Sequence, residues 1–182
     1  MKTKIAVLFT GFLAAVLVLP LAAEVILSKD DAVKQIFPDA DKTEEKEVAL
    51  TAAHKKSMKD TYGWDLSAES VKVRVSTKAG KVIGRTVFIP ETGKHGKIWV
   101  AVGIMTDGTV ARAAVCSLSE VRGKPVAQDQ FLKQFKGKSP RDSFTIGSGV
   151  QAVSGATLSS KSVAAAIRKG SILLNTLFPA AS

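Results

Sequence analysis

Apolar and polar residues alternate with a period of two through the middle of the chain, the pattern of half-buried β-strands. Valines alternate with polar residues from residue 71, and the turn Ala79-Gly80 leads into a second apolar run. Two further runs follow with Asp107-Gly108 between them, and Asp-Gly between apolar runs is a strong hairpin signal. The pattern predicts an antiparallel sheet whose four strands cover residues 71–76, 82–89, 98–105 and 110–116.

Apolar residues at helical spacing flank this region on both sides. Ser28 and Asp31 match a capping box that opens a short helix, which Pro38 ends. The other predicted helices cover residues 49–62, 131–135 and a C-terminal segment that begins near Ser159 or Ser160. The charged stretch 39–47 and the stretch 90–96 are predicted as loops. An antiparallel sheet flanked by helices predicts an α+β fold in a single domain.

The first 23 residues are typical of a secretory signal or a membrane anchor. Lys2 and Lys4 precede an uncharged apolar run over 5–19, and Pro20 and small residues follow. The run is short for a membrane span, so we favour a cleaved signal over a retained anchor. Either segment predicts a location outside the cytoplasm, in the periplasm or on the outer face of the membrane. Three parts are expected: the leader 1–23, helices and the first hairpin in 24–96, and the rest of the core in 97–178.

Composition limits the classes of function that remain. The 182 residues are 46% apolar and 23% charged, as in one globular domain. The net charge is +10, but the lysines are dispersed rather than gathered among aromatic residues, so a nucleic-acid partner is not expected. The single Cys116 lies in an apolar run and is predicted to be buried. His54 and His95 have no partners at ligand spacing, so no metal site is expected.

Residues 151–160 place four hydroxyl groups and a glycine directly before the C-terminal helix. A helix start offers unpaired N–H groups and the positive end of the helix dipole, which together bind anions. No Asp or Glu occurs from residue 143 to 182, while Lys161, Arg168 and Lys169 lie in the helix. A phosphate group is therefore a candidate ligand. From the residues alone, a simple turn with an N-cap explains the same stretch equally well.

Ser154-Gly155-Ala156-Thr157, followed by Leu158-Ser159, resembles the flavinylation motif of the FMN-binding domain family. This family includes the C subunit of the sodium-pumping NADH:quinone oxidoreductase and the G subunit of the Rnf electron-transport complex. The resemblance implies that Thr157 carries FMN through a phosphoester, attached by a flavin transferase that uses FAD as the donor. Gln151 stands where the family often has Asp.

The resemblance also extends to other residues, from about residue 97 to 174. Glu120 and Gly123 partly match a Glu-Thr-Pro-Gly loop that lies close to the flavin in the family, and residues 134–138 match a Gln-Phe-x-Gly-Lys pattern. The resemblance implies a set of residues around the cofactor: Ser154, Gly155, Ala156, Leu158, Ser159, Ser160, Lys161 and Glu120. No catalytic residue is implied.

These features favour an exported FMN-binding electron carrier, because a phosphoester retains the cofactor and leaves its redox-active ring free. The implied partners are the flavin transferase and redox proteins of the membrane or periplasm. Two alternatives remain open. One is an FMN-dependent reductase with a substrate of its own, and the other is a flavin-free exported module whose basic surface binds an acidic partner or anionic lipid.

Two competing motifs account for the same residues less well. Residues 147–152 satisfy Gly-x-Gly-x-x-Ala, but a dinucleotide site requires an acidic residue about 20 positions later and none occurs there. Ser154 does not lie in a Gly-x-Ser-x-Gly elbow, and neither histidine has the context of a catalytic triad. A dinucleotide-binding unit and a serine hydrolase are therefore disfavoured.

Overall fold

A computed structural model describes residues 24–94, 96–118 and 121–180. A six-stranded sheet forms its centre, with the strand order β1-β6-β5-β4-β3-β2 and antiparallel pairing throughout. Its strands are β1 (Glu24–Val25), β2 (Lys42–Ala49), β3 (Ser70–Lys78), β4 (Lys81–Thr92), β5 (Lys97–Met105) and β6 (Val110–Leu118). Two short strands, β7 (Thr145–Ile146) and β8 (Gly149–Val150), pair with each other outside the sheet.

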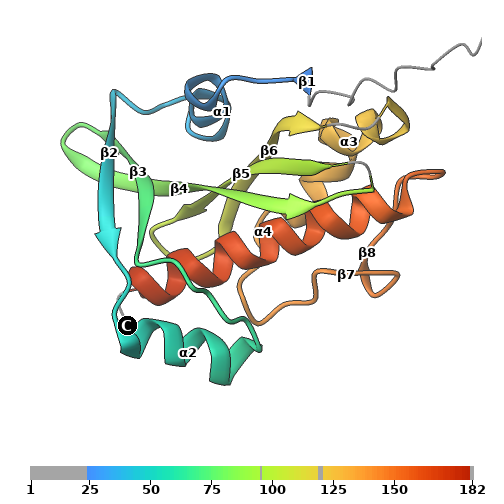
Figure 1. Ribbon diagram of the computed structural model, residues 1–182. Coiled ribbons are helices and arrows are strands. Elements are labelled where there is room, and N and C mark those ends of the chain that lie inside the picture. Colours follow the sequence, from blue (N-terminus) through green and yellow to red (C-terminus); the bar gives the residue numbers. More distant parts are fainter. Residues whose placement is uncertain (1–23, 95, 119–120, 181–182) are drawn as a thin grey trace, which may run out of the picture.

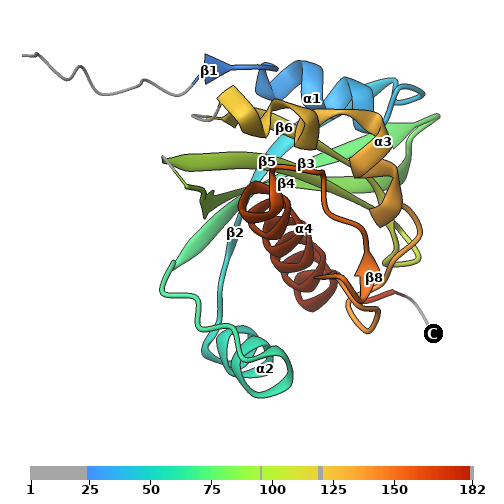
Figure 2. The ribbon, with the colours of Figure 1, turned by 90° about the vertical axis from the view of Figure 1, so that its right-hand side faces the viewer.

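Helices cover both faces of the sheet (Figures 1 and 2). The helical elements are α1 (Lys29–Ile36), α2 (Ala52–Tyr62), the 3-10 helix η1 (Val121–Ala127), α3 (Asp129–Leu132), the 3-10 helix η2 (Lys133–Phe135) and α4 (Thr157–Leu177). The long helix α4 lies across one face against β4 and β5, and α1 lies on the opposite face against β5 and β6. The predicted α+β fold is therefore confirmed.

Side chains of β5 point alternately to the two faces of the sheet, so this strand contributes to two hydrophobic cores. Val100, Val102 and Ile104 are buried in the larger core beneath α4. Ala101 faces α1 with Ile36 and forms a smaller core there. Small residues on the α1 side let the helix approach closely, because a Cβ added to Gly103 would lie 2.2 Å from Cγ2 of Ile36.

Several predicted elements are confirmed at their ends. Ser28 caps α1 by accepting a hydrogen bond from the Asp31 N–H. Gly63 ends α2 in the left-handed region with φ 66°, which glycine adopts without strain. The turn at Asp107-Gly108 joins β5 to β6 as expected.

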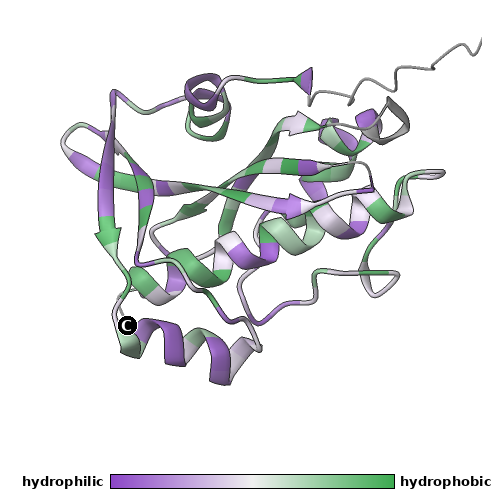
Figure 3. Ribbon diagram, viewed as in Figure 1, coloured by the Kyte–Doolittle hydropathy of each residue, from purple (hydrophilic) through white to green (hydrophobic). Residues whose placement is uncertain are grey.

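The predicted loop over 39–47 is wrong, because residues 42–49 form the edge strand β2. Nearly all of β2 is exposed on both faces, so its sequence shows no apolar alternation (Figure 3). It is held in the sheet by eight residue pairs with β3 and by ion pairs between side chains of the two strands. Glu45 lies 3.1 Å from Lys72 Nζ and 3.1 Å from Arg74 Nε. Charged residues on an edge strand also discourage pairing with other chains.

Two further boundaries differ from prediction. The helix expected from residue 49 begins at Ala52, because Ala49 still belongs to β2 and Thr51 is the N-cap. The loop expected from residue 90 begins later, because β4 continues to Thr92. Pro90 is tolerated in a strand here because it pairs only with Trp99 of β5, and the β3 ladder has already ended at Val87.

Candidate functional site

The start of α4 presents an exposed hydroxyl at the first helical position. Thr157 is the first residue of the helix and Ala156 is its N-cap, with no side-chain hydrogen bond to the cap. The prediction that the helix begins at Ser159 or Ser160, with a hydroxyl as cap, is therefore wrong. First-turn N–H groups have no carbonyl partner within their helix, so those of Thr157 and Leu158 point toward the motif turn.

Ser160 explains why the turn before α4 has a defined shape. Its hydroxyl is completely buried, donates to the Ala156 carbonyl at 2.9 Å and accepts from the Val153 N–H at 3.0 Å. Gly155 lies between these points with φ +72°, and an added Cβ would meet no atom within 4 Å. The turn thus needs glycine for its backbone conformation, and it leaves open space beside Thr157.

The structure separates the sequence-predicted site residues into two groups. The residues that face solvent are Ser154, Gly155, Thr157, Leu158 and Lys161. Ala156, Ser159 and Ser160 are buried. Leu158 is 56% exposed, which is unusual for a leucine next to a polar motif and leaves apolar surface beside Thr157. Glu120 lies outside the described residues.

A groove of about 460 Å³ runs along one side of the motif, between it and α3. Its lining includes Ser154, Gln151, Phe131 and Gln134. The Gln134 amide holds the backbone of Gln151 at two points: Nε2 donates to the Gln151 carbonyl at 3.2 Å, and Oε1 accepts from its N–H at 2.8 Å. Because the contact uses only the backbone of residue 151, the side chain of Gln151 remains exposed toward the groove.

The positioning role of Gln134 was missed by sequence reasoning, which treated it only as part of a family pattern. Gln134 and Gln151 are seventeen positions apart in sequence, and no periodicity links them. The one available signal was its place near the end of a short predicted amphipathic helix.

The other side of the motif is fastened to the end of β4. The Ser162 hydroxyl donates to the Thr92 carbonyl at 2.7 Å. Further along α4, Lys169 Nζ forms an ion pair of 2.5 Å with Glu91. These contacts fix the first turns of α4 against the sheet, so Thr157 projects from a rigid element.

The electrostatics of this region favour an anion. Asp142 is the nearest acidic residue before the motif in sequence. Its carboxylate accepts hydrogen bonds from the N–H and hydroxyl of Ser139, which lower its pKa and offset its negative charge locally. Lys161 and Arg168 follow the motif on α4, where they flank a second, smaller groove beside β7. A phosphate at the helix start would therefore meet N–H donors and positive charge.

Other kinds of site are not found in the part of the chain that the structure describes. Its His, Cys, Asp and Glu residues form no group of three or more that could hold a metal ion. Among the helices of residues 24–180 that are described, none has the length and apolar character of a membrane span. Trp64 and Trp99 are half-buried and pack against the two hydrophobic cores.

Comparison with known proteins identifies similar chains. Residues 93–171 match the model of the FMN-binding domain. Over 122 residues the chain is 29% identical to the G subunit of the ion-translocating oxidoreductase complex of Cereibacter sphaeroides. That alignment covers 61% of this chain and 56% of the relative, so the chain spans just over half the length of the curated relative that it matches.

Two solved structures share the fold. NqrC of Shewanella oneidensis superposes with a TM-score of 0.56 at 19% identity, covering 80% of this chain and 85% of that chain. The C subunit of the Na⁺-translocating NADH-quinone reductase from Parabacteroides distasonis superposes with a TM-score of 0.54 at 17% identity, covering 86% of each chain. At these identities the likeness concerns the fold.

Proposed function

We propose that the chain is an electron-transfer protein that holds FMN covalently through a phosphoester to Thr157. The match of residues 93–171 to the FMN-binding domain supports FMN as the cofactor. The observation that carries this proposal is the exposed Thr157 hydroxyl at the first position of α4. A transferase can reach this hydroxyl, and the helix start stabilises the phosphate that the reaction leaves there.

The residues present fit the phosphate end of FMN. Gly155 has φ +72° and open space where a side chain would lie, so the backbone can approach a phosphate closely. The N–H groups of Thr157 and Leu158 at the start of the helix are donors, and Lys161 adds positive charge one turn later. Leu158 offers exposed apolar surface beside the attachment point. FMN itself supplies the redox chemistry, and the protein supplies attachment, position and electrostatics.

The attachment reaction needs only Thr157 and FAD as reactants. The Oγ of Thr157 forms a bond to the FMN phosphorus of FAD, and the phosphoanhydride bond to AMP breaks. The threonine proton is released and AMP leaves, so no oxidant or reductant is needed. Ser160 and Gln134 hold the turn during this step through their contacts to residues 151–156.

The same proposal places residues 24–182 outside the cytoplasm and assigns them a flavin transferase and membrane or periplasmic redox proteins as partners. The composition of the first 23 residues supports export, and they lie outside the described residues. The relatives are named as subunits of ion-translocating redox complexes, which supports partners of that kind.

The test is mass spectrometry of the full-length chain produced with a flavin transferase. We expect the wild-type chain to gain the mass of FMN less water, to show flavin fluorescence in a denaturing gel, and to yield a modified peptide that contains Thr157. Thr157→Ala should lose all three signals, whereas Thr157→Ser should keep them. Thr61→Ala is the matched control, because it removes the same hydroxyl and methyl groups from an exposed threonine on another helix, α2.

Two outcomes contradict covalent attachment at Thr157. One is a Thr157→Ala chain that keeps denaturation-resistant flavin. The other is a wild-type chain that binds FMN only while folded, which would leave a non-covalent flavoprotein and direct attention to Gln151.

A further inference from the structure

The central sheet divides between β3 and β4, and a cavity opens where it divides. Pairing between these strands ends at Val73 and Val87. Beyond that point β3 continues with β2 only, to Ser70, while β4 continues with β5 only, to Thr92. A cavity of about 460 Å³ lies in the gap, bounded also by α4 and the segment after α2. Its volume falls in the range of about 300–1,000 Å³ that is typical of small-molecule sites.

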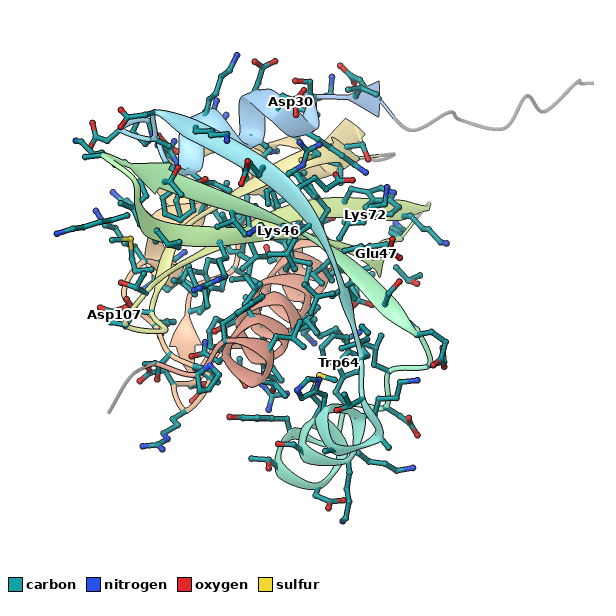
Figure 4. The ribbon with its side chains drawn as sticks, turned by 90° about the vertical axis from the view of Figure 1, so that its left-hand side faces the viewer. Asp30, Lys46, Glu47, Trp64, Lys72 and Asp107 are labelled. Carbon is teal, nitrogen blue, oxygen red and sulfur yellow. The ribbon has the colours of Figure 1, made fainter. Side chains whose placement is uncertain are left out.

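The walls of this cavity, here called the split-sheet cavity, are apolar and rich in aromatic rings. Its apolar lining includes Trp64, Leu66, Val71, Phe88, Trp99 and Leu173. Trp64 and Trp99 are the two tryptophans of the whole chain. In Figure 4, Trp64 lies between α4 and α2, below Lys72 on β3. Flat rings on several sides favour a ligand that is itself planar.

Positive charge collects at the same cavity. The Lys29 ammonium lies 5.2 Å from the ring centre of Phe88 and 5.4 Å from that of Trp99, so its contacts are aromatic faces. No acidic group forms an ion pair with Lys29 among the residues that the structure describes. Lys72 and Lys169 also line the cavity, and Glu45 is the one acidic lining residue.

The acidic groups nearby are already paired. Glu45 is shared between Lys72 and Arg74, each at 3.1 Å, and the hydrogen bond to Lys72 lowers the pKa of its carboxyl group. Lys169 pairs with Glu91 and lies 5.9 Å from the ring centre of Trp64. The charge of Lys29 also helps to lower the pKa of Glu45, but Lys29 forms no ion pair with a carboxylate in the part of the chain that the structure describes. Lys29 is therefore the lining cation without a close carboxylate partner among the described residues.

We propose that the split-sheet cavity is a second ligand site, which takes a planar aromatic molecule bearing one anionic group. The ring would lie against Trp64 and Trp99, and the carboxylate, sulfonate or phosphate would pair with Lys29. This site is separate from the FMN attachment point. Lys169 follows Thr157 by twelve positions on α4, which corresponds to roughly 18 Å along a helix. The inference goes beyond the proposed function and does not depend on it.

The test is calorimetric titration of the flavinylated full-length protein with 1-naphthoate, a planar aromatic carboxylate. The neutral probe 1-naphthalenemethanol has the same ring system without the charge. We expect 1-naphthoate to bind with a stoichiometry of one and about tenfold more tightly than the neutral probe, as a hydrogen-bonded charge pair predicts. Lys29→Gln should remove that advantage and leave the affinity for the neutral probe unchanged.

Matched variants separate the cavity from the rest of the surface. Lys34→Gln removes a charge from the same helix at a residue that does not line the cavity, so the affinity for 1-naphthoate should not change. Ala68→Phe places a ring in the cavity and should abolish binding of both probes, whereas Ala53→Phe on the exposed face of α2 should not. Circular dichroism and thermal melting verify that each variant is folded.

Several results would overturn the second site. The first is that the wild-type protein does not bind 1-naphthoate. The second is that Lys29→Gln binds 1-naphthoate as tightly as the wild type does. The third is that a folded Ala68→Phe variant binds both probes as tightly as the wild type does. Titration of the flavin-free Thr157→Ala chain supplies a further check. If that chain binds 1-naphthoate and the flavinylated protein does not, the cavity belongs to the flavin ring and the proposal of a separate site is wrong.

Discussion

Ser160 shows how a single buried hydroxyl can shape the turn that precedes Thr157. Ser160→Ala removes the acceptor of the half-buried Val153 N–H, and an unpaired amide costs about 1–3 kcal/mol. We expect the free energy of unfolding in urea to fall by this amount and FMN attachment to slow, because the turn that presents Thr157 loosens. Ser154→Ala is the control for stability, since that side chain is exposed. Equal unfolding curves for Ser160→Ala and wild type would contradict this role.

Cys116 is a second residue whose chemistry is set by its burial. Only 5% of the residue is exposed, and burial raises the pKa of its thiol. Because a thiol with a raised pKa is less ionised at a given pH, and the thiolate is the reactive form, the folded protein should react slowly with Ellman's reagent at about pH 8. In urea one equivalent should react at the rate of a free cysteine. Reaction of the folded protein at the rate seen in urea would show that the thiol is accessible.

At the scale of elements, the packing of α4 on β5 depends on Gly170. A Cβ at this position would lie 2.7 Å from Cβ of Val102, so the helix sits too close to the strand for a side chain. Alanine in place of glycine normally stabilises a helix by about 1 kcal/mol, but overpacking costs about 1–3 kcal/mol. We expect Gly170→Ala to lower the stability measured by urea unfolding.

A double-mutant cycle tests whether the cost of Gly170→Ala comes from its contact with Val102. Val102→Gly removes Cβ and both methyl groups that the added Cβ of Gly170→Ala would meet, so the double variant should be more stable than the sum of the single changes predicts. An independent, additive pair of effects would indicate that the close approach of α4 to β5 does not explain the cost.

At the scale of the whole molecule, charge is divided unequally between the two halves of the chain. Residues 24–92 contain twelve basic and twelve acidic residues, whereas residues 93–182 contain twelve basic and four acidic ones. The half that includes the residues matching the FMN-binding domain therefore carries the net positive charge. Such a field attracts anionic reactants and repels cationic ones, and salt screens both effects.

This asymmetry predicts opposite salt effects on two small oxidants of the reduced flavin. The rate with ferricyanide, an anion, should fall several-fold as salt rises from about 10 mM to about 500 mM, because the Debye length shrinks to a few ångströms. The rate with hexaammineruthenium(III), a cation, should rise over the same range. Stopped-flow absorbance of the flavin measures both. Parallel salt dependence of the two rates would show that the field around the flavin is not positive.

Much of the architecture follows from local rules that the sequence alone expresses. The valine alternation and Asp107-Gly108 predict the hairpins because side chains in a strand point alternately to two faces. Ser28 and Gly63 mark helix ends through their own hydrogen-bonding and backbone properties. These features depend on residues within a few positions of one another.

The elements that were missed depend on distant residues instead. Strand β2 has no apolar alternation and exists because β3 pairs with it, with Glu45 held by Lys72 and Arg74. The start of α4 at Thr157 depends on the buried Ser160 hydroxyl, which the sequence could not distinguish from an N-cap. Patterns among neighbouring residues do not show which distant residues will contact one another.

The sequence by itself determined the α+β class, the position of the hairpins and the Ser154-Gly155-Ala156-Thr157 motif before a helix free of nearby acidic residues. The tertiary structure alone decided which hydroxyls of that motif face solvent and which are buried, and it opened a charged aromatic cavity between β3 and β4. The physical reason is that exposure and cavities arise from packing between segments far apart in the chain, whereas turns, caps and periodicity arise from neighbouring residues.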